Sequence, residues 1–103
     1  MPAGWTHAEI NYYSGGAGHT LVLDRGLVTS ASGSALTLRE QDGTSWTIPL
    51  SPSTKVFANG SPGSIAMIRP GEIALTRRVD GGPASAVQLR IPPRIAARIA
   101  AGR

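Results

Sequence analysis

Apolar and polar residues alternate in short runs along most of the chain, and glycine, proline, asparagine and aspartate separate the runs. Because successive side chains of a β-strand point to opposite faces, this period of two predicts strands with one buried face. The residues between the runs are those that turns favour. We expect eight short strands, at residues 5–13, 19–24, 27–31, 35–40, 44–48, 55–58, 72–78 and 84–91.

Many short strands at close spacing are typical of an all-β barrel or sandwich. One helical turn is expected at residues 64–68, where Ser64 can cap its start. A single turn before the penultimate strand favours a small antiparallel β-barrel, OB-like or SH3-like, of seven or eight strands. We expect one barrel domain over residues 5–91 and a basic tail over residues 92–103.

The loop after the fourth expected strand can be assigned by matching apolar faces across the hairpin. A two-residue loop would place the apolar positions of the two strands on opposite faces. A three-residue loop, Gln41-Asp42-Gly43 with Gly43 left-handed, instead sets Leu38 opposite Trp46 and Leu36 opposite Ile48. This register predicts that Trp46 lies in the core.

The same matching of faces assigns the other hairpins. In the first, a four-residue loop over residues 14–17 pairs apolar residues inside and one charged pair outside: Ile10 with Leu21, Ala8 with Leu23, and His7 with Asp24. In the second, a loop over residues 32–34 places Val28 opposite Leu38 and Thr29 opposite Thr37. In the last, a loop over residues 80–82 pairs Leu75 with Val87, Ile73 with Leu89 and Glu72 with Arg90.

Charge is distributed unevenly over the 103 residues, whose net charge is +4. Residues 1–68 contain three basic and four acidic residues, whereas residues 69–103 contain seven arginines and two acids. The chain has no cysteine, which excludes a disulfide scaffold and a thiolate metal site. No apolar run is long enough to cross a membrane, and the first residues lack the pattern of a signal peptide. Arginine outnumbers lysine nine to one, which is typical of proteins from GC-rich bacterial genomes.

Catalytic and metal-binding chemistry is sparse in this sequence. His7, Glu9 and His19 form its one candidate metal cluster, but the expected register places His19 beside Tyr12, away from the other two. Because a divalent site usually needs three convergent ligands, we expect no metal site and a solvated pair of His7 with Asp24. No nucleophile with an adjacent base and no phosphate-binding glycine loop appears, so we expect neither an enzyme nor a cofactor.

The arginines of the last hairpin and tail are the candidate polyanion-binding residues: Arg77, Arg78, Arg90, Arg94 and Arg98. A single-stranded nucleic acid would also need exposed aromatic rings on which bases can stack. Phe57 and Tyr13 are the candidates for that role. In the tail, four-residue spacing would separate an arginine row from an isoleucine row on a helical turn. The tail could therefore meet a polyanion or an apolar groove of another copy, or stay solvated.

Five motifs at strands and turns mark the middle of the chain: G-L-V-T-S-A-S-G-S-A-L-T-L, D-G-T, S-T-K-V, N-G and R-P-G-E. With them the chain, from Gly26 to about Arg90, resembles a family of small bacterial β-domains of unknown function. The resemblance implies a small β-barrel, often found in envelope or secreted proteins, without catalytic residues. The first 25 residues and the arginine-rich end lie outside the pattern.

Three functions are compatible with these observations. The first is a non-catalytic β-barrel that acts as an accessory or interaction module, in the cell envelope or secreted, with a protein partner or self-association. The second is a barrel that binds nucleic acid through the arginine-rich last third. The third is a structural subunit that assembles by strand addition, for which the long N-terminal hairpin offers an edge.

Overall fold

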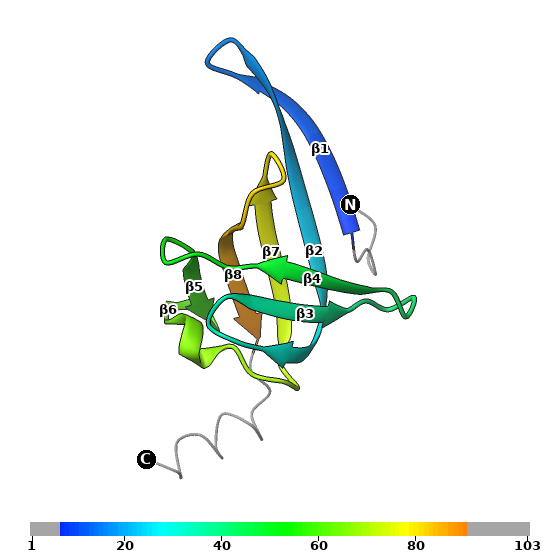
Figure 1. Ribbon diagram of the computed structural model, residues 1–103, viewed down its shortest axis with the longest axis vertical. Helices are drawn as coiled ribbons and strands as arrows, with labels where there is room; N and C mark the ends of the chain where they lie inside the picture. The colour runs from blue at the N-terminus through cyan, green and yellow to red at the C-terminus, as the bar shows by residue number, and fades with distance from the viewer. Residues whose placement is uncertain (1–6, 91–103) are drawn as a thin grey trace.

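The structure is a computed structural model that describes residues 7–90. Its regular elements are eight strands and one 3-10 turn (Figure 1): β1 (His7–Ser14), β2 (Ala17–Ala31), β3 (Ala35–Arg39), β4 (Ser45–Pro49), β5 (Lys55–Ala58), β6 (Ser61–Pro62), η1 (Ile65–Met67), β7 (Ile73–Val79) and β8 (Ala84–Arg90). All strands belong to one sheet, in the order β4-β3-β2-β7-β8-β5-β6, and β1 pairs with β2. The all-β prediction is confirmed, and the helical turn lies where it was expected.

The expected closed antiparallel barrel is not formed. Within residues 7–90 no ladder joins β4 to β5 or β6, so the sheet stays open. It is also mixed, because β5 runs parallel to β8 while the other pairs are antiparallel. A parallel pair needs a crossover connection, and residues 59–83, which carry the chain from β5 to β8, provide it. The expected tail, residues 92–103, lies outside the described residues. Within residues 7–90 no helix is long and apolar enough to span a membrane.

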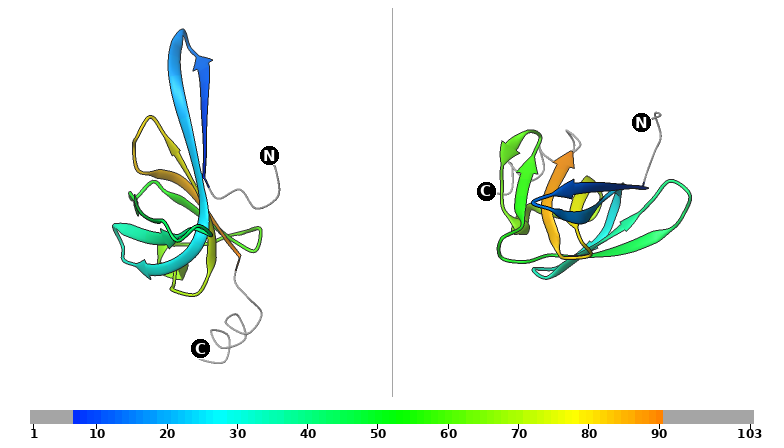
Figure 2. Two further views of the ribbon diagram at one scale, coloured as in Figure 1. Left: turned by 90° about the vertical axis from the view of Figure 1, so that its right-hand side faces the viewer. Right: turned by 90° about the horizontal axis from the view of Figure 1, so that it is seen from above.

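The central element is β2, which is 15 residues long. One edge pairs with β7 over residues 21–27, and the other pairs first with β1 and then with β3. The predicted interruption at residues 24–26 is therefore wrong, because hydrogen bonding to β7 keeps this segment extended. Figure 2 shows that the far end of the β1–β2 hairpin projects beyond the rest of the sheet.

The β1–β2 and β3–β4 hairpins have the registers that face matching predicts. Ile10 pairs with Leu21 and His7 with Asp24. The predicted faces of β1–β2 are wrong, however, because Ile10 is exposed and Asp24 is buried. In β3–β4, Leu36 pairs with Ile48 and Leu38 with Trp46. Gly43 has a φ of +89°, which confirms the left-handed position in the loop. Trp46 itself is 38% exposed, so its prediction as a core residue is wrong.

Two bulges displace residues that simple loop counting had paired. Between β2 and β3, Val28 pairs with Leu38 as expected, but Thr37 pairs with Ser30 and Thr29 is the extra residue. Between β7 and β8, Arg78 pairs with Ala84, which is the expected register near the loop.

The second bulge overturns the predicted pairing in the rest of β7–β8. Beyond it the register moves by one residue, so Ile73 pairs with Arg90 and Leu75 with Gln88. Glu72 does not meet Arg90; it is completely buried, and its Oε1 accepts a hydrogen bond from the backbone N–H of Arg69 at 2.7 Å.

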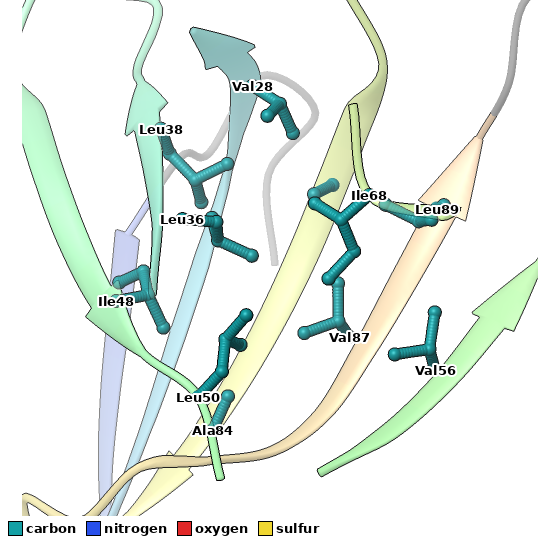
Figure 3. Close-up of a cluster of buried hydrophobic side chains, with 11 residues drawn as sticks. Val28, Leu36, Leu38, Ile48, Leu50, Val56, Ile68, Ala84, Val87 and Leu89 are labelled. Carbon is teal, nitrogen blue, oxygen red and sulfur yellow. The ribbon is translucent and has the colours of Figure 1, made fainter. Parts of the chain in front are cut away.

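The core lies on one side of the sheet, which we call the inner face (Figure 3). It is formed by buried aliphatic residues from β2, β3, β4, β5, β7 and β8 and from adjacent loops: Val28, Leu36, Leu38, Ile48, Leu50, Val56, Ile68, Ala74, Ala84, Val87 and Leu89. The shifted register buries Ala74 and Thr76 of β7 and turns Ile73 and Leu75 to the opposite side, the outer face.

Candidate functional site

The outer face carries three rows of side chains that cross the sheet at successive levels. These rows follow from the pairing of alternate residues on β2, β7, β8 and the neighbouring strands. The first row contains Leu23, Arg77, Ala86 and Lys55; the second contains Arg25, Leu75, Gln88 and Phe57; the third contains Arg39, Leu27, Ile73 and Arg90. Each row thus combines apolar and cationic side chains.

These rows are hollowed rather than flat. A groove of about 1250 Å³ lies over the second and third rows, with Arg39 and Arg90 among its lining residues. A smaller hollow of about 390 Å³ adjoins the first row and includes Arg77. Phe57 and Leu75 line both, so the two hollows form one concave surface with an apolar floor.

The outer face is strongly biased in charge. The three rows contain five cations and no acidic residue. Glu40 adjoins the groove at the end of β3, but its side chain is turned inward to Trp46 and the residue is only 5% exposed. The three rows themselves therefore contribute positive charge and no carboxylate.

The structure divides the sequence-predicted polyanion site. Arg77 and Arg90 lie on the outer face, as the rows require. Arg78 does not join them: its guanidinium donates to the carbonyls of Gly82 at 2.9 Å and Gly81 at 3.1 Å, and so closes the β7–β8 loop. Two further candidates, Arg94 and Arg98, lie outside the described residues.

Three cations of this face were missed by the sequence reasoning: Arg25, Arg39 and Lys55. They come from the part of the chain whose net charge is slightly negative. The signal that could have found Arg25 is its place between Leu23 and Leu27 on alternate positions of one strand. That signal was lost when the strand was predicted to end at residue 24.

Among the aromatic residues, Phe57 and Tyr13 lie as expected and Trp46 does not. Phe57 is half-buried and lines the groove, as a stacking surface requires. Tyr13 is 86% exposed near the tip of the β1–β2 hairpin. Trp46 stacks against His7, with ring centroids 5.2 Å apart and 9° between the planes. Phe57 is therefore the aromatic ring that the groove offers.

A second cluster of polar residues forms where β1 begins and β3 ends along the same edge of β2. At the start of β1, His7 pairs with Asp24, and at the end of β3, Arg39 pairs with Leu27. Gly26 of β2 allows the end of β3 to approach closely, because a Cβ there would lie 2.6 Å from the Arg39 carbonyl oxygen. This geometry brings together His7 at the start of β1, Asp24 in the middle of β2 and Glu40 just after β3.

The cluster is held by short polar contacts and is largely buried. The His7 Nδ1 lies 2.5 Å from Asp24 Oδ1, and its Nε2 lies 3.2 Å from Glu9 Oε2. The Trp46 Nε1–H donates to Glu40 Oε1 at 2.9 Å. Asp24 is 1% exposed. The predicted pair of His7 with Asp24 is confirmed, but Asp24 is buried rather than solvated.

The environment shifts the proton affinity of two members of the cluster. The hydrogen bond to Asp24 raises the pKa of His7 above its usual range. Burial raises the pKa of Glu40, and the neighbouring Asp24 carboxylate adds to the effect. His7 and Glu40 therefore retain protons more strongly than the same side chains in water.

His19 lies beside Tyr12 and away from His7 and Glu9, as the expected register places it. His19 pairs with Asp80, whose Oδ2 lies 2.6 Å from the His19 Nδ1, and stacks on Tyr12. Glu9 remains beside His7. The sequence reasoning found Asp24 as the neighbour of His7 but missed Glu40, because Glu40 reaches His7 only through the pairing of both β1 and β3 with β2.

No protein-family model, curated protein or solved structure matches this chain. The resemblance to small bacterial β-domains, and the envelope location that it implies, stay predictions.

Proposed function

We propose that this protein is a non-catalytic binding module whose outer face holds single-stranded nucleic acid. The observation that carries the proposal is the segregation of charge: five cations and no acid lie in the three rows. A polyanion complements such a surface, and release of its counterions adds to the affinity.

The arrangement of the outer face favours a single strand over a duplex. Arg39 and Arg90 stand three strands apart in one row, roughly 14 Å at the usual strand spacing. Between them the groove has an apolar floor with Phe57, on which an unpaired base can stack. In a duplex the bases are already stacked on each other, so this floor would not be used.

Nucleic-acid binding was the second of the three functions compatible with the sequence, and OB folds combine a basic groove with stacking rings. The open sheet offers such a surface without barrel closure. In this proposal contact depends on the backbone and on one ring, so the module binds without strong preference for sequence.

A second candidate is assembly by strand addition. Within the described residues, β1 pairs only with β2, so its other backbone edge is open. Ile10 and Tyr13 are exposed on the same hairpin, at 43% and 86%. An added strand from another chain would satisfy that edge and cover these side chains.

Titration of a labelled single-stranded oligonucleotide tests the first proposal, with anisotropy measured from about 50 mM salt upward. The logarithm of the binding constant should fall with log salt by about 0.7 per phosphate contact. Replacement of Arg77 by Gln should weaken binding and reduce the slope by about 0.7. The adjacent Arg78→Gln is the matched control, because Arg78 contacts the loop and should leave the slope unchanged.

Two results would contradict the assignment to the outer face. One is the absence of binding at about 50 mM salt. The other is a slope that Arg39→Gln and Arg77→Gln leave unchanged, while an Arg94→Gln/Arg98→Gln double variant of the full chain flattens it. Light scattering separates the second candidate, which requires self-association without nucleic acid or a partner captured through β1.

A further inference from the structure

We propose that His7, Asp24 and Glu40 form a binding site for a divalent transition-metal ion of the Zn²⁺ class. One donor atom from each residue lies within 4.8 Å of the other two. Glu40 also adjoins the groove, but the site does not depend on the function proposed for the outer face.

The donor set suits such an ion. One imidazole nitrogen and two carboxylate oxygens are ligands that Zn²⁺ accepts, at about 2.0–2.2 Å from each. Ligands at that distance lie about 3–4 Å apart, so the Nδ1 of His7 and the Oδ1 of Asp24 must separate by roughly an ångström from their present 2.5 Å. The His7 side chain can move by this amount because His7 is the first residue of β1 and forms the terminal pair of the β1–β2 ladder.

A buried Glu40 oxygen that receives no donor from the described residues lies beside Asp24, where a shared proton or a cation would satisfy it. Glu40 is 5% exposed, and among residues 7–90 its Oε2 has no hydrogen-bond partner while its Oε1 accepts from Trp46. A buried acceptor without a partner is costly unless a proton or a cation satisfies it. Two buried carboxylates beside each other supply the two negative charges that a divalent ion neutralises.

The surroundings hold the ligands in the orientation that a metal site needs. The His7 Nε2 lies 3.2 Å from Glu9, so an Nε2–H donor would leave Nδ1 unprotonated and directed at the carboxylates. Trp46 fixes Glu40 through its indole N–H and covers His7 by stacking. Three protein ligands leave further coordination positions for water or a ligand, as in sites of the open type.

The chemistry of the set also limits which ions it takes. Mg²⁺ prefers an all-oxygen, octahedral environment and retains its water, so it should bind weakly beside an imidazole. Zn²⁺ and Co²⁺ accept mixed nitrogen and oxygen ligands. We therefore expect Zn²⁺ and Co²⁺ to compete for one site per chain and Mg²⁺ not to displace them.

Trp46 provides a direct readout, because it contacts two of the three ligands. In a full-length Trp5→Phe background Trp46 is the single tryptophan. Paramagnetic Co²⁺ should quench its fluorescence with one-to-one saturation, and Zn²⁺ should reverse the quenching. Calorimetry with Zn²⁺ gives the affinity in the unsubstituted chain.

The variants form a graded series. Glu40→Gln keeps the acceptor for Trp46 and removes one anionic ligand, so Zn²⁺ affinity should fall more than 10-fold. Glu9→Gln is exposed and changes only the orienting contact, for which about 10-fold is expected. The matched control is His19→Gln, which removes the second histidine of the chain. His19 lies outside the cluster and pairs with the exposed carboxylate of Asp80, so this variant should not change the Zn²⁺ affinity. Circular dichroism checks that each variant is folded.

The proposal is overturned if Zn²⁺ does not bind at about 1 mM, or if His19→Gln lowers the affinity while Glu40→Gln does not. A weak Zn²⁺ affinity that all three variants leave unchanged also rejects it. In the competing state the Glu40 carboxyl group keeps its proton. The ¹³C chemical shift of that carboxyl carbon reports its protonation, and a proton retained in the presence of Zn²⁺ would also reject the metal site.

Discussion

The two faces of the sheet carry charged side chains of opposite sign and different exposure. The outer face collects cations in a concave surface around Leu75 and Phe57. On the inner side the described acids of β2 and of the loops beside β3 and β7 are almost fully buried: Asp24, Glu40 and Glu72. Alternation along single strands produces this division, since Arg25 and Asp24 are neighbours in sequence and face apart. We therefore expect the buried acids of the inner side to affect stability and the proposed metal site. The cations of the outer face should affect the binding of nucleic acid.

The largest effect is expected from Leu38→Ala on the inner face. Leu38 is fully buried among aliphatic neighbours, so its truncation should cost about 2–5 kcal/mol of unfolding free energy. The half-buried Leu75 of the outer face is the matched control, and Leu75→Ala should cost clearly less. Urea unfolding of both variants measures the difference, and equal costs would contradict the assignment of faces.

Next in size is Gly26→Ala at the junction of β1 and β3. Its Cβ would meet the Arg39 carbonyl at 2.6 Å, and a backbone atom cannot rotate away. Overpacking of this kind should cost about 1–3 kcal/mol and lower the affinity of the proposed metal site. Gly33→Ala, which has open space around its Cβ, serves as the control. A neutral Gly26→Ala would show that β2 and the end of β3 are not in close contact at this position.

A pH-dependent effect is expected from Glu72→Gln. Burial raises the pKa of Glu72 in the folded protein above its value in the unfolded chain. The contribution of Glu72 to stability is therefore greatest at pH values below the unfolded pKa, and it is lost as pH rises through the folded pKa. The variant keeps the Oε1 acceptor for Arg69, so its stability relative to the parent should increase from about pH 4 to pH 7.

Asp42→Asn should show the opposite dependence. The backbone N–H of Thr44 lowers the pKa of Asp42, so the carboxylate stabilises the fold above its unfolded pKa and this is lost as pH falls. Thermal unfolding of both variants between pH 3 and 7 makes the comparison. Parallel pH profiles for the two variants would reject the burial of Glu72.

The smallest stability effect is expected from the outer-face cations. Arg77→Gln should change the unfolding free energy by no more than about 0.5 kcal/mol, because Arg77 is exposed. The same variant is expected to reduce nucleic-acid binding. A loss of stability above about 1 kcal/mol would mean that Arg77 supports the fold and that its binding phenotype is indirect.

The hairpin registers show which parts of the fold could be predicted from the sequence. For β1–β2 and β3–β4, the loop residues and the apolar alternation agree with each other, and both registers are confirmed. For β7–β8 the loop predicts the first pair, Arg78 with Ala84, but the bulge shifts the remaining pairs by one. The strand partners beyond the hairpin contribute to this choice. Asp80 accepts from the Thr20 N–H and its own N–H donates to the Thr20 carbonyl, so β2 also positions the loop.

The sequence by itself determined the all-β class, the positions of nearly all the strands and the two hairpins whose contacts are local. These depend on alternation and turn residues a few positions apart, which any short window contains. Tertiary structure decided the continuity of β2, the parallel pairing of β5 with β8 and the open sheet. It also brought His7, Asp24 and Glu40 together and placed Arg39 with Arg90. The physical reason is that these features arise from hydrogen bonding between distant strands, and a shift of one residue in that pairing exchanges the buried and exposed faces.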